Sequence, residues 1–207
     1  MKIICISDTH GQHWRLKIDP CDILIHCGDM DIQCISHLKD INEWFGQQPS
    51  KKNICIPGNH DRFLEREDKY FLKTEFTNAC LLIHDIIKIN CLSFFGSPFS
   101  PAFNNWSFEY QRCSEKAKRI WYGIPPSLDF LITHGPPYDV LDRNLDDERC
   151  GCEVLQREIS RKSPKYHCFG HIHGEYGQNF EHDVQFINCS VLNEDYKLVN
   201  KPTIINI

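Results

Sequence analysis

The sequence predicts an α/β layered domain that contains a mixed sheet or two stacked sheets. Short β-rich runs recur along the chain, and each ends at a polar loop that contains glycine. Segments with the periodicity of amphipathic helices lie between these runs. No repeat, low-complexity segment or long polar linker divides the 207 residues. We therefore expect a single domain over residues 1–207.

The predicted strands consist mainly of β-branched and other apolar residues. Six run into polar loops, at Lys2–Ile6, Asp22–Cys27, Asn53–Ile56, Phe130–Thr133, Tyr166–Phe169 and Val184–Asn188. Three more, partly antiparallel, are expected at Leu81–Ile83, Ile86–Ile89 and Leu92–Phe95, and a terminal one at Thr203–Ile207. Apolar residues at helical spacing predict one helix through Ile35, Leu38, Ile41, Trp44 and Phe45, and another through Cys152, Leu155 and Ile159. A third helix is expected over Ser114–Tyr122.

The composition excludes several classes of function. The chain has 23 Lys and Arg against 28 Asp and Glu, a net charge of −5, so we expect no general binding to nucleic acid or to an anionic membrane. The mean hydropathy is −0.43, and no apolar run approaches the roughly 18 residues of a membrane-spanning helix. The first residues do not resemble a secretory signal. These features predict a cytoplasmic protein.

The 12 cysteines are expected to be free thiols. Disulfide frameworks are typical of short secreted chains, whereas many of these cysteines lie within apolar runs, where a thiol behaves as a small buried hydrophobe. A structural zinc site is not predicted, because no Cys-x-x-Cys pair occurs and Cys150-Gly-Cys152 is too closely spaced.

Polar side chains with metal-binding chemistry follow almost every predicted strand. Ligand sites of α/β sheets lie beyond the carboxyl ends of the strands, so these side chains are expected to converge. They are Asp8, His10, Asp29, Asn59, His60, Asp61, His134, His171 and His173. Carboxylates, imidazoles and one amide suit Mn, Fe or Zn, and they are too numerous for one ion. The sequence therefore predicts a two-metal site in which one carboxylate bridges the ions.

The order of these motifs, DxH, GD, GNHD, HG and GHxH, resembles that of the calcineurin-like metallophosphoesterases. The stretches SDTHG, DILIHCGD, IPGNHD, FFGSPFSP, FLITHGPP and FGHIHGEYG are similar to the small MPPED-type phosphodiesterase subfamily, and the resemblance covers nearly the whole chain. It implies a four-layer α/β/β/α sandwich of two stacked mixed sheets.

The resemblance also implies the roles of the site residues. One metal ion would bind Asp8, His10, Asp29 and His173, and the other would bind Asp29, Asn59, His134 and His171. In this scheme Asp29 bridges the ions. His60 would act on the phosphate or the leaving group, and Asp61 would orient His60 and assist its proton transfer.

Further residues are assigned to substrate or to packing. Substrate binding is assigned to Asn59, Arg149, Gly151 and Cys152, with nucleophilic chemistry at Cys150 or Cys152 as a minor alternative. Aromatic residues such as Trp106 are expected to pack or to stack a nucleobase. His26 is expected to support Asp29, whereas His13, His37, His84, His167 and His182 are expected at the surface or at caps.

These features predict a phosphodiesterase that acts on small phosphodiesters with two divalent ions, which would be Mn, Fe or Zn. The resemblance suggests cyclic nucleotides as substrates. Metal-bridged hydroxide, available because the ions lower the pKa of bound water toward about 7, would attack the phosphorus in line. The alternatives are a non-catalytic interaction scaffold, which would have no need to keep His60, and a nuclease, which would need a basic surface.

Overall fold

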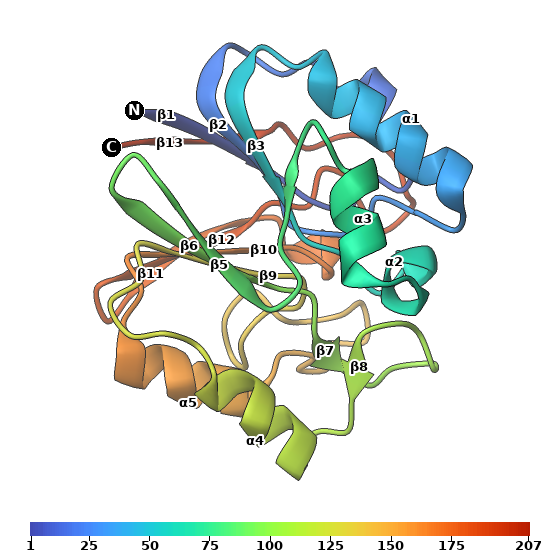
Figure 1. Cartoon of the computed structure of the whole chain (residues 1–207). Coiled ribbons are helices and arrows are strands. Elements are labelled where there is room, and N and C mark those ends of the chain that lie inside the picture. The colour runs from blue at the N-terminus through green and yellow to red at the C-terminus, as the bar shows by residue number, and fades with distance from the viewer.

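The computed structural model describes all 207 residues and contains two main sheets stacked face to face (Figure 1). The first sheet has the strand order β13 (Thr203–Asn206), β1 (Lys2–Ile6), β2 (Cys21–His26), β3 (Ser50–Cys55) and β4 (Cys80–Leu81). The second has the order β11 (Gly177–Glu181), β12 (Val184–Asn188), β10 (Tyr166–Phe169), β9 (Phe130–Thr133), β6 (Leu92–Ser97) and β5 (Asp85–Ile89). A small pair is formed by β7 (Ser100–Pro101) and β8 (Glu109–Tyr110).

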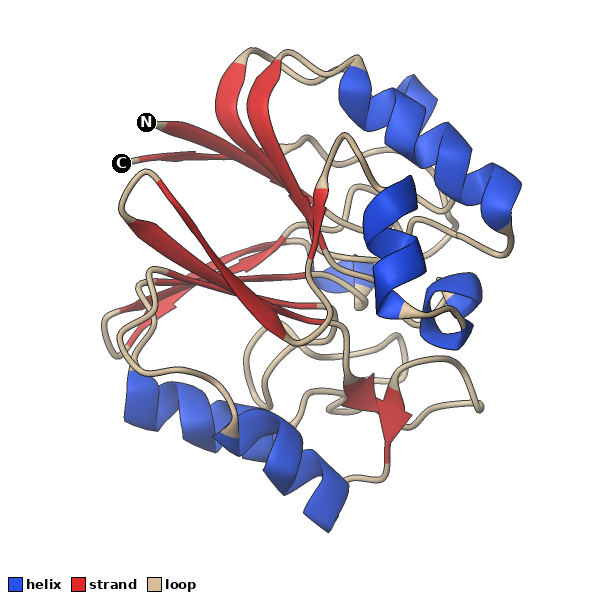
Figure 2. Cartoon of the chain, in the orientation of Figure 1, coloured by secondary structure: helices blue, strands red, loops and turns tan.

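Both main sheets are mixed. The inner strands are parallel, whereas β13, β11 and β5 each pair antiparallel with their neighbours. Helices cover the two outer faces (Figure 2). On the first sheet these are α1 (Ile35–Gly46), α2 (Arg62–Arg66) and α3 (Lys69–Glu75), and on the second α4 (Glu115–Tyr122) and α5 (Glu153–Lys162). Two 3-10 turns are η1 (His13–Arg15) and η2 (His173–Glu175). The predicted four-layer α/β/β/α sandwich is confirmed.

The core has three parts, because the central strands are buried on both faces. On β1, Ile3 and Cys5 face the other sheet, while Ile4 and Ile6 face α1. Continuous apolar runs are what such doubly buried parallel strands require. The inter-sheet layer also contains Phe94, which stacks on the ring of Phe130 at a centroid distance of 4.8 Å.

All 12 cysteines are free thiols, and several of them fill this inter-sheet layer. Cys5 and Cys168 bring their sulfur atoms to 3.7 Å across the two sheets. These side chains act as small apolar groups at the place where the sheets approach each other.

Three parts of the structure differ from expectation. Residues 62–75 form two short helices that were not predicted, because their sequence is strongly charged and only Leu64 and Leu72 are buried. Strand β11 is a polar edge strand, which lacks a clear apolar pattern. His13 and His167 are buried rather than exposed. No helix in the structure has the length and apolar character needed to cross a membrane.

Candidate metal centre

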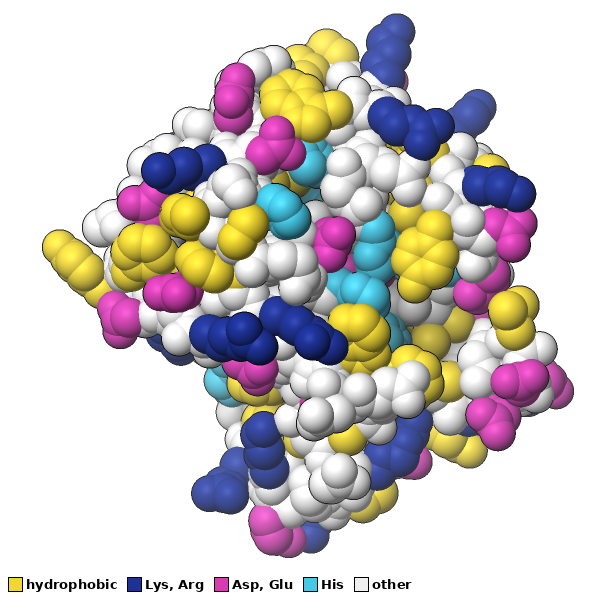
Figure 3. All heavy atoms as spheres, turned by 90° about the vertical axis from the view of Figure 1, so that its right-hand side faces the viewer, with side chains coloured by type: hydrophobic (Ala, Val, Ile, Leu, Met, Phe, Trp, Pro, Cys, Tyr) yellow, Lys and Arg dark blue, Asp and Glu magenta, His cyan; other side chains and the backbone are white.

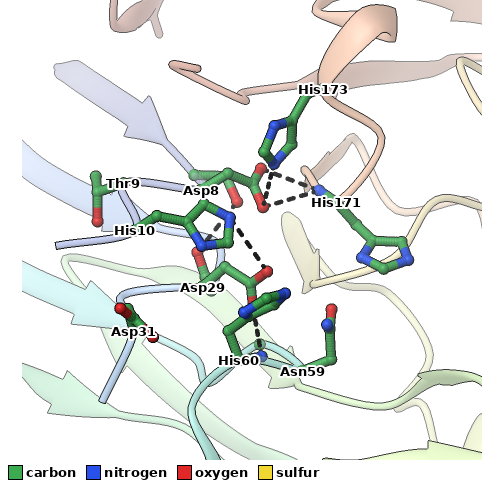
Figure 4. A network of polar contacts seen from close by, with 12 residues as sticks. Asp8, Thr9, His10, Asp29, Asp31, Asn59, His60, His171 and His173 are labelled. Carbon is green, nitrogen blue, oxygen red and sulfur yellow. Dashed lines mark hydrogen bonds and ion pairs between the residues drawn. The ribbon is translucent and has the colours of Figure 1, made fainter. Parts of the chain in front are cut away.

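The predicted metal ligands and His60 meet beyond the carboxyl ends of parallel strands from both sheets (Figure 4). The strands β1, β2 and β3 of the first sheet lead to the loops that carry Asp8 and His10, Asp29, and Asn59 and His60. The strands β9 and β10 of the second sheet lead to His134, His171 and His173. The site therefore lies across the boundary between the two sheets, and each sheet supplies part of it.

Asp29 lies between two groups of potential ligands. Its Oδ2 atom is 3.6 Å from Nε2 of His10, and its Oδ1 atom is 3.3 Å from Nε2 of His134. One group consists of Asp8, His10 and His173, and the other of Asp29, His134 and His171, with the ligand atoms of each group within 4.8 Å of one another. The amide oxygen of Asn59 is 2.8 Å from Nε2 of His134. These groups overlap with the two predicted ligand sets, and a further group of His10, Asp29 and His60 includes a residue that was not predicted as a ligand.

The loops that carry these side chains have an unusual backbone conformation. Asp8, His10, Asp29 and His171 all have positive φ, between 40° and 71°. A residue other than glycine pays about 1 kcal/mol or more for such a conformation, and the strained residues of proteins cluster at functional sites. The surrounding hydrogen bonds maintain the strained loops: the amide of Asp8 donates to Gly28, and the amide of His10 donates to Asp29.

The two carboxylates are buried and depend on nearby donors. Asp8 accepts hydrogen bonds from the Ser190 hydroxyl (2.7 Å) and from the His171 amide. Asp29 accepts one from the His60 amide (2.8 Å). Burial alone would raise the pKa of Asp29, but the neighbouring imidazoles, His134 above all, hold that pKa well below its usual value. Both aspartates are therefore poised as carboxylates.

The imidazoles present the nitrogen that a metal ion needs. Nδ1 of His134 contacts the Cys27 carbonyl (3.0 Å), and Nδ1 of His173 contacts the Asn193 carbonyl (3.1 Å), so each ring directs Nε2 at the carboxylates. Such outer hydrogen bonds fix the tautomer of metal-binding histidines. Nε2 of His10 is buried and has no hydrogen-bond partner in the protein. A divalent cation would satisfy that atom.

The protonation of the imidazoles also fits metal binding. Burial lowers the pKa of His10, and it lowers the pKa of His171 to about 4, so both rings are neutral at pH 7. Burial would lower the pKa of His134 as well, but the Asp29 carboxylate outweighs it and raises that pKa to about 9. A proton at His134 thus occupies the position that a cation would take. The chemistry of the donor set therefore fits divalent metal ions.

His60 lies at the surface of the cluster, and its imidazole contacts two rings. The edge of His10 is at a centroid distance of 4.7 Å, and Trp106 stacks on it at 4.1 Å. Asp61 does not contact this imidazole. Its buried carboxylate accepts hydrogen bonds from the amides of Gly58, Met30 and Ile32. The predicted role of Asp61 in orienting His60 is therefore wrong, because three backbone amides occupy its carboxylate.

A cavity of about 390 Å³ adjoins the cluster at His171. Arg149 lines it, but its guanidinium is already paired with Asp139 and Asp142. Phe103 and Arg112 lie among the other lining residues. Seen from the right-hand side of Figure 1, several histidine side chains gather around an acidic one and are open to solvent (Figure 3).

Gly151 and Cys152 make local structural contacts and do not line this cavity. The Gly151 amide donates to Asp142, and a Cβ atom at Gly151 would lie 2.2 Å from the Pro137 carbonyl oxygen. The buried Cys152 thiol caps α5 by accepting from the Leu155 amide. Their predicted substrate-binding role is therefore corrected to a structural one. Burial raises the pKa of the thiols of Cys150 and Cys152, which disfavours the thiolate that nucleophilic attack requires.

Several contributing residues escaped the sequence analysis. Ser190 follows β12, so the rule that polar residues beyond strand ends belong to the site also applies to it. Tyr196 places its ring against those of His10 and His173, and no local pattern marks it. His26, which was expected to support Asp29, contacts the Thr9 hydroxyl and the Gly28 amide and not Asp29 itself.

The fold and the cluster together define the class of protein, a metal-dependent phosphoesterase with the metallophosphoesterase fold. The family model described as calcineurin-like phosphoesterase matches residues 1–175, and the chain belongs to that family.

Known relatives support the assignment to the MPPED-type subfamily. Human metallophosphoesterase domain-containing protein 1 is 32% identical over 233 residues, covering 100% of this chain and 71% of that protein. A UPF0046 protein of Caenorhabditis elegans is 31% identical over 224 residues, covering 100% of this chain and 75% of that protein. The solved structure of phosphopantetheinyl hydrolase from Mycobacterium tuberculosis has 15% identity and a TM-score of 0.61, covering 94% of this chain and 90% of that one. This last similarity concerns the fold alone.

Proposed function

We propose that the protein is a phosphodiesterase that hydrolyses small phosphodiesters, such as cyclic nucleotides, with two divalent metal ions. The observation that carries this proposal is the position of Asp29, whose two carboxylate oxygens face His10 on one side and His134 on the other. A carboxylate between two sets of nitrogen and oxygen donors is the arrangement that a two-metal site requires.

Two ions at this centre would be held by two sets of side chains that share Asp29, and manganese is our first choice for both. The first set is Asp8, His10, Asp29 and His173, and the second is Asp29, Asn59, His134 and His171. When bound, divalent ions supply water of lowered pKa at neutral pH and neutralise charge on phosphoryl oxygens.

The chain's own groups would position the ester and assist the leaving group. The His60 imidazole is partly exposed beside the centre, and neither of its ring nitrogens is engaged by another protein group. It is therefore free to donate a hydrogen bond to a phosphoryl oxygen or a proton to the departing alkoxide, which is worth about 10² to 10⁴ in rate. Asn59 would fix the phosphoryl group through its amide.

The cavity beside His171 supports a small organic substrate. A phosphoryl group at the cluster would extend one ester substituent into this space, where Phe103 offers an apolar surface and Asn144 and Glu148 offer hydrogen-bonding groups. A nucleoside has both kinds of surface. The resemblance to MPPED-type phosphodiesterases suggests cyclic nucleotides, including 2′,3′-cyclic ones, and a cytoplasmic location agrees with such substrates.

The proposal is tested by hydrolysis of bis-p-nitrophenyl phosphate with chelator-stripped protein, with and without Mn²⁺, beside p-nitrophenyl phosphate. We expect Mn²⁺ to restore activity and the diester to be cleaved faster than the monoester. Monoester cleavage that exceeds diester cleavage would contradict the phosphodiesterase assignment. Two bound metals without turnover of either ester would favour the scaffold alternative.

A matched pair of variants tests the role of Asp29. Asp29→Asn keeps the shape of the side chain but removes the shared charge, so metal content and activity should both fall to background. Asp22→Asn changes a carboxylate at the opposite end of the same strand, where it contacts Lys2 and Lys51, and should keep both. Wild-type turnover by Asp29→Asn would refute the proposed centre.

A further inference from the structure

The His60 side chain depends on ring contacts for its orientation. Its main chain is fixed, because the amide donates to Asp29 and the carbonyl accepts from the Gln33 side chain. No protein group forms a hydrogen bond with either nitrogen of the ring. The ring lies edge-on to His10, with an interplanar angle of 86°, and nearly parallel to Trp106, at 26°. Trp106 is therefore the group that supports the face of the imidazole.

Trp106 is itself held by residues on both sides of His60 in the sequence. The guanidinium carbon of Arg62, in the first turn of α2, lies 4.3 Å from the centroid of the indole. The amide of Ser107 donates to the Asn59 carbonyl (3.2 Å), and the amide of Phe108 donates to the Glu65 carboxylate (2.9 Å). The segment 106–108 is thus attached both to the loop that precedes His60 and to the helix that follows it.

We infer that Trp106 is a positioning residue: its indole holds the His60 imidazole at the metal centre, with Arg62 as a second contact of the indole. The inference rests on the proposed function, in which the free nitrogen of His60 acts on the ester. A catalytic group must be held near its productive geometry, and an error of about 1 Å can cost about 10² in rate. Stacking fixes the plane of the ring and leaves both nitrogens available.

The same geometry argues against a different role for Trp106, that of stacking a nucleobase. The indole lies against the imidazole at 4.1 Å and against Arg62 at 4.3 Å, so two protein groups already pack on the ring. A residue that binds substrate would change KM when it is replaced. A residue that positions His60 would change kcat, and only while His60 is present.

The kinetic test is a double-mutant cycle with Mn²⁺-loaded enzyme and bis-p-nitrophenyl phosphate. Trp106→Ala should lower kcat about 10- to 100-fold, with KM within about twofold and metal content unchanged. Trp106→Phe should recover most of the loss, because it restores an aromatic face. In a His60→Ala background, Trp106→Ala should cause no further loss. Trp14→Ala removes a partly exposed indole that contacts Asp40, and it should leave kcat unchanged.

Two results would overturn the inference. The first is an equal fold-loss from Trp106→Ala with and without His60, which would mean that the indole acts independently. The second is a rise in KM at constant kcat, which would assign the indole to substrate binding. If Trp106→Ala does not fold, as judged by circular dichroism, Trp106→Leu replaces it in the cycle, since leucine keeps bulk but offers no aromatic face.

A measurement on the metal-free protein separates this inference from the proposed function. The indole should shift the ring-proton NMR signals of His60 upfield, and Trp106→Ala should abolish that shift while Trp14→Ala keeps it. Wild-type protein that binds metal but hydrolyses no ester would refute the proposed function even if the shift is present. Absence of the shift in wild-type protein would refute the stacking whatever the activity.

Discussion

Gly58 allows the loop after β3 to approach Asp29 very closely, and Gly58→Ala should disrupt the centre. A Cβ atom at this position would lie 2.2 Å from Oδ1 of Asp29, 2.4 Å from its amide nitrogen and 2.8 Å from Cε1 of His134. Non-bonded heavy atoms normally remain about 3.5 to 4.0 Å apart, so the two loops must separate by about 1 Å. Because the nearby nitrogen belongs to the backbone, rotation of the Asp29 side chain cannot relieve the overlap.

A displacement of this size at the shared carboxylate should lower kcat/KM for a diester about 100-fold and weaken metal binding. The overpacking should also cost about 1 to 3 kcal/mol of stability. The φ of Gly58 is not in the left-handed region, so alanine is acceptable to the backbone and the effect is steric.

The assay combines diester kinetics with metal content by atomic spectroscopy and with urea unfolding. Gly177→Ala is the matched control, since the nearest atom to its Cβ would be the Glu175 carbonyl oxygen at 3.8 Å. It should retain wild-type kinetics and metal content. Gly58→Ala with full metal content and kcat/KM within twofold of wild type would refute this account of the close approach.

Three further predictions concern buried groups outside the metal cluster. Burial lowers the pKa of His167 to about 3, against about 6.5 when unfolded, so only the unfolded state binds this proton as pH falls below 6.5. His167→Gln should therefore reduce the loss of stability between pH 6 and 4 by up to about 1.4 kcal/mol per pH unit; urea midpoints with an unchanged pH slope would contradict this. Phe94→Ala should lower the free energy of unfolding by about 3 to 5 kcal/mol, and a loss under about 1 kcal/mol would mean that the inter-sheet layer repacks. Asp61→Ala leaves three amides without their acceptor, each worth about 1 to 3 kcal/mol, so thermal unfolding should occur well below the wild-type temperature; wild-type stability would argue that water replaces the carboxylate.

The local sequence pattern was sufficient to predict those strands whose carboxyl ends carry the site residues. The ranges Lys2–Ile6, Phe130–Thr133 and Tyr166–Phe169 were predicted with the bounds that the structure shows, because each is a mainly apolar run that ends at a polar, glycine-containing loop. The polar residues after those strands converge as expected, since parallel strands present their carboxyl ends at one edge.

Features that depend on tertiary contacts could not be predicted in this way. Asp61 is adjacent to His60 in the sequence, yet two of its three amide partners, Met30 and Ile32, belong to a different loop. The stacking of Trp106 on His60 likewise joins residues separated by 46 positions, and nothing local to either residue encodes it. His167 lies on a strand covered on both faces, which its polar side chain does not reveal.

The position of the cluster across the two sheets links metal binding to the cohesion of the fold. Asp8 and His10 extend from the first sheet and His173 from the second. Asp29, which follows a strand of the first sheet, likewise faces His134, which follows a strand of the second. Ions bound there would therefore act as cross-links between layers that are otherwise joined by apolar packing. By mass action such a cross-link stabilises the folded chain in proportion to the logarithm of metal concentration. Conversely, a substitution deep in the inter-sheet layer would weaken metal binding without changing any residue that binds the metal.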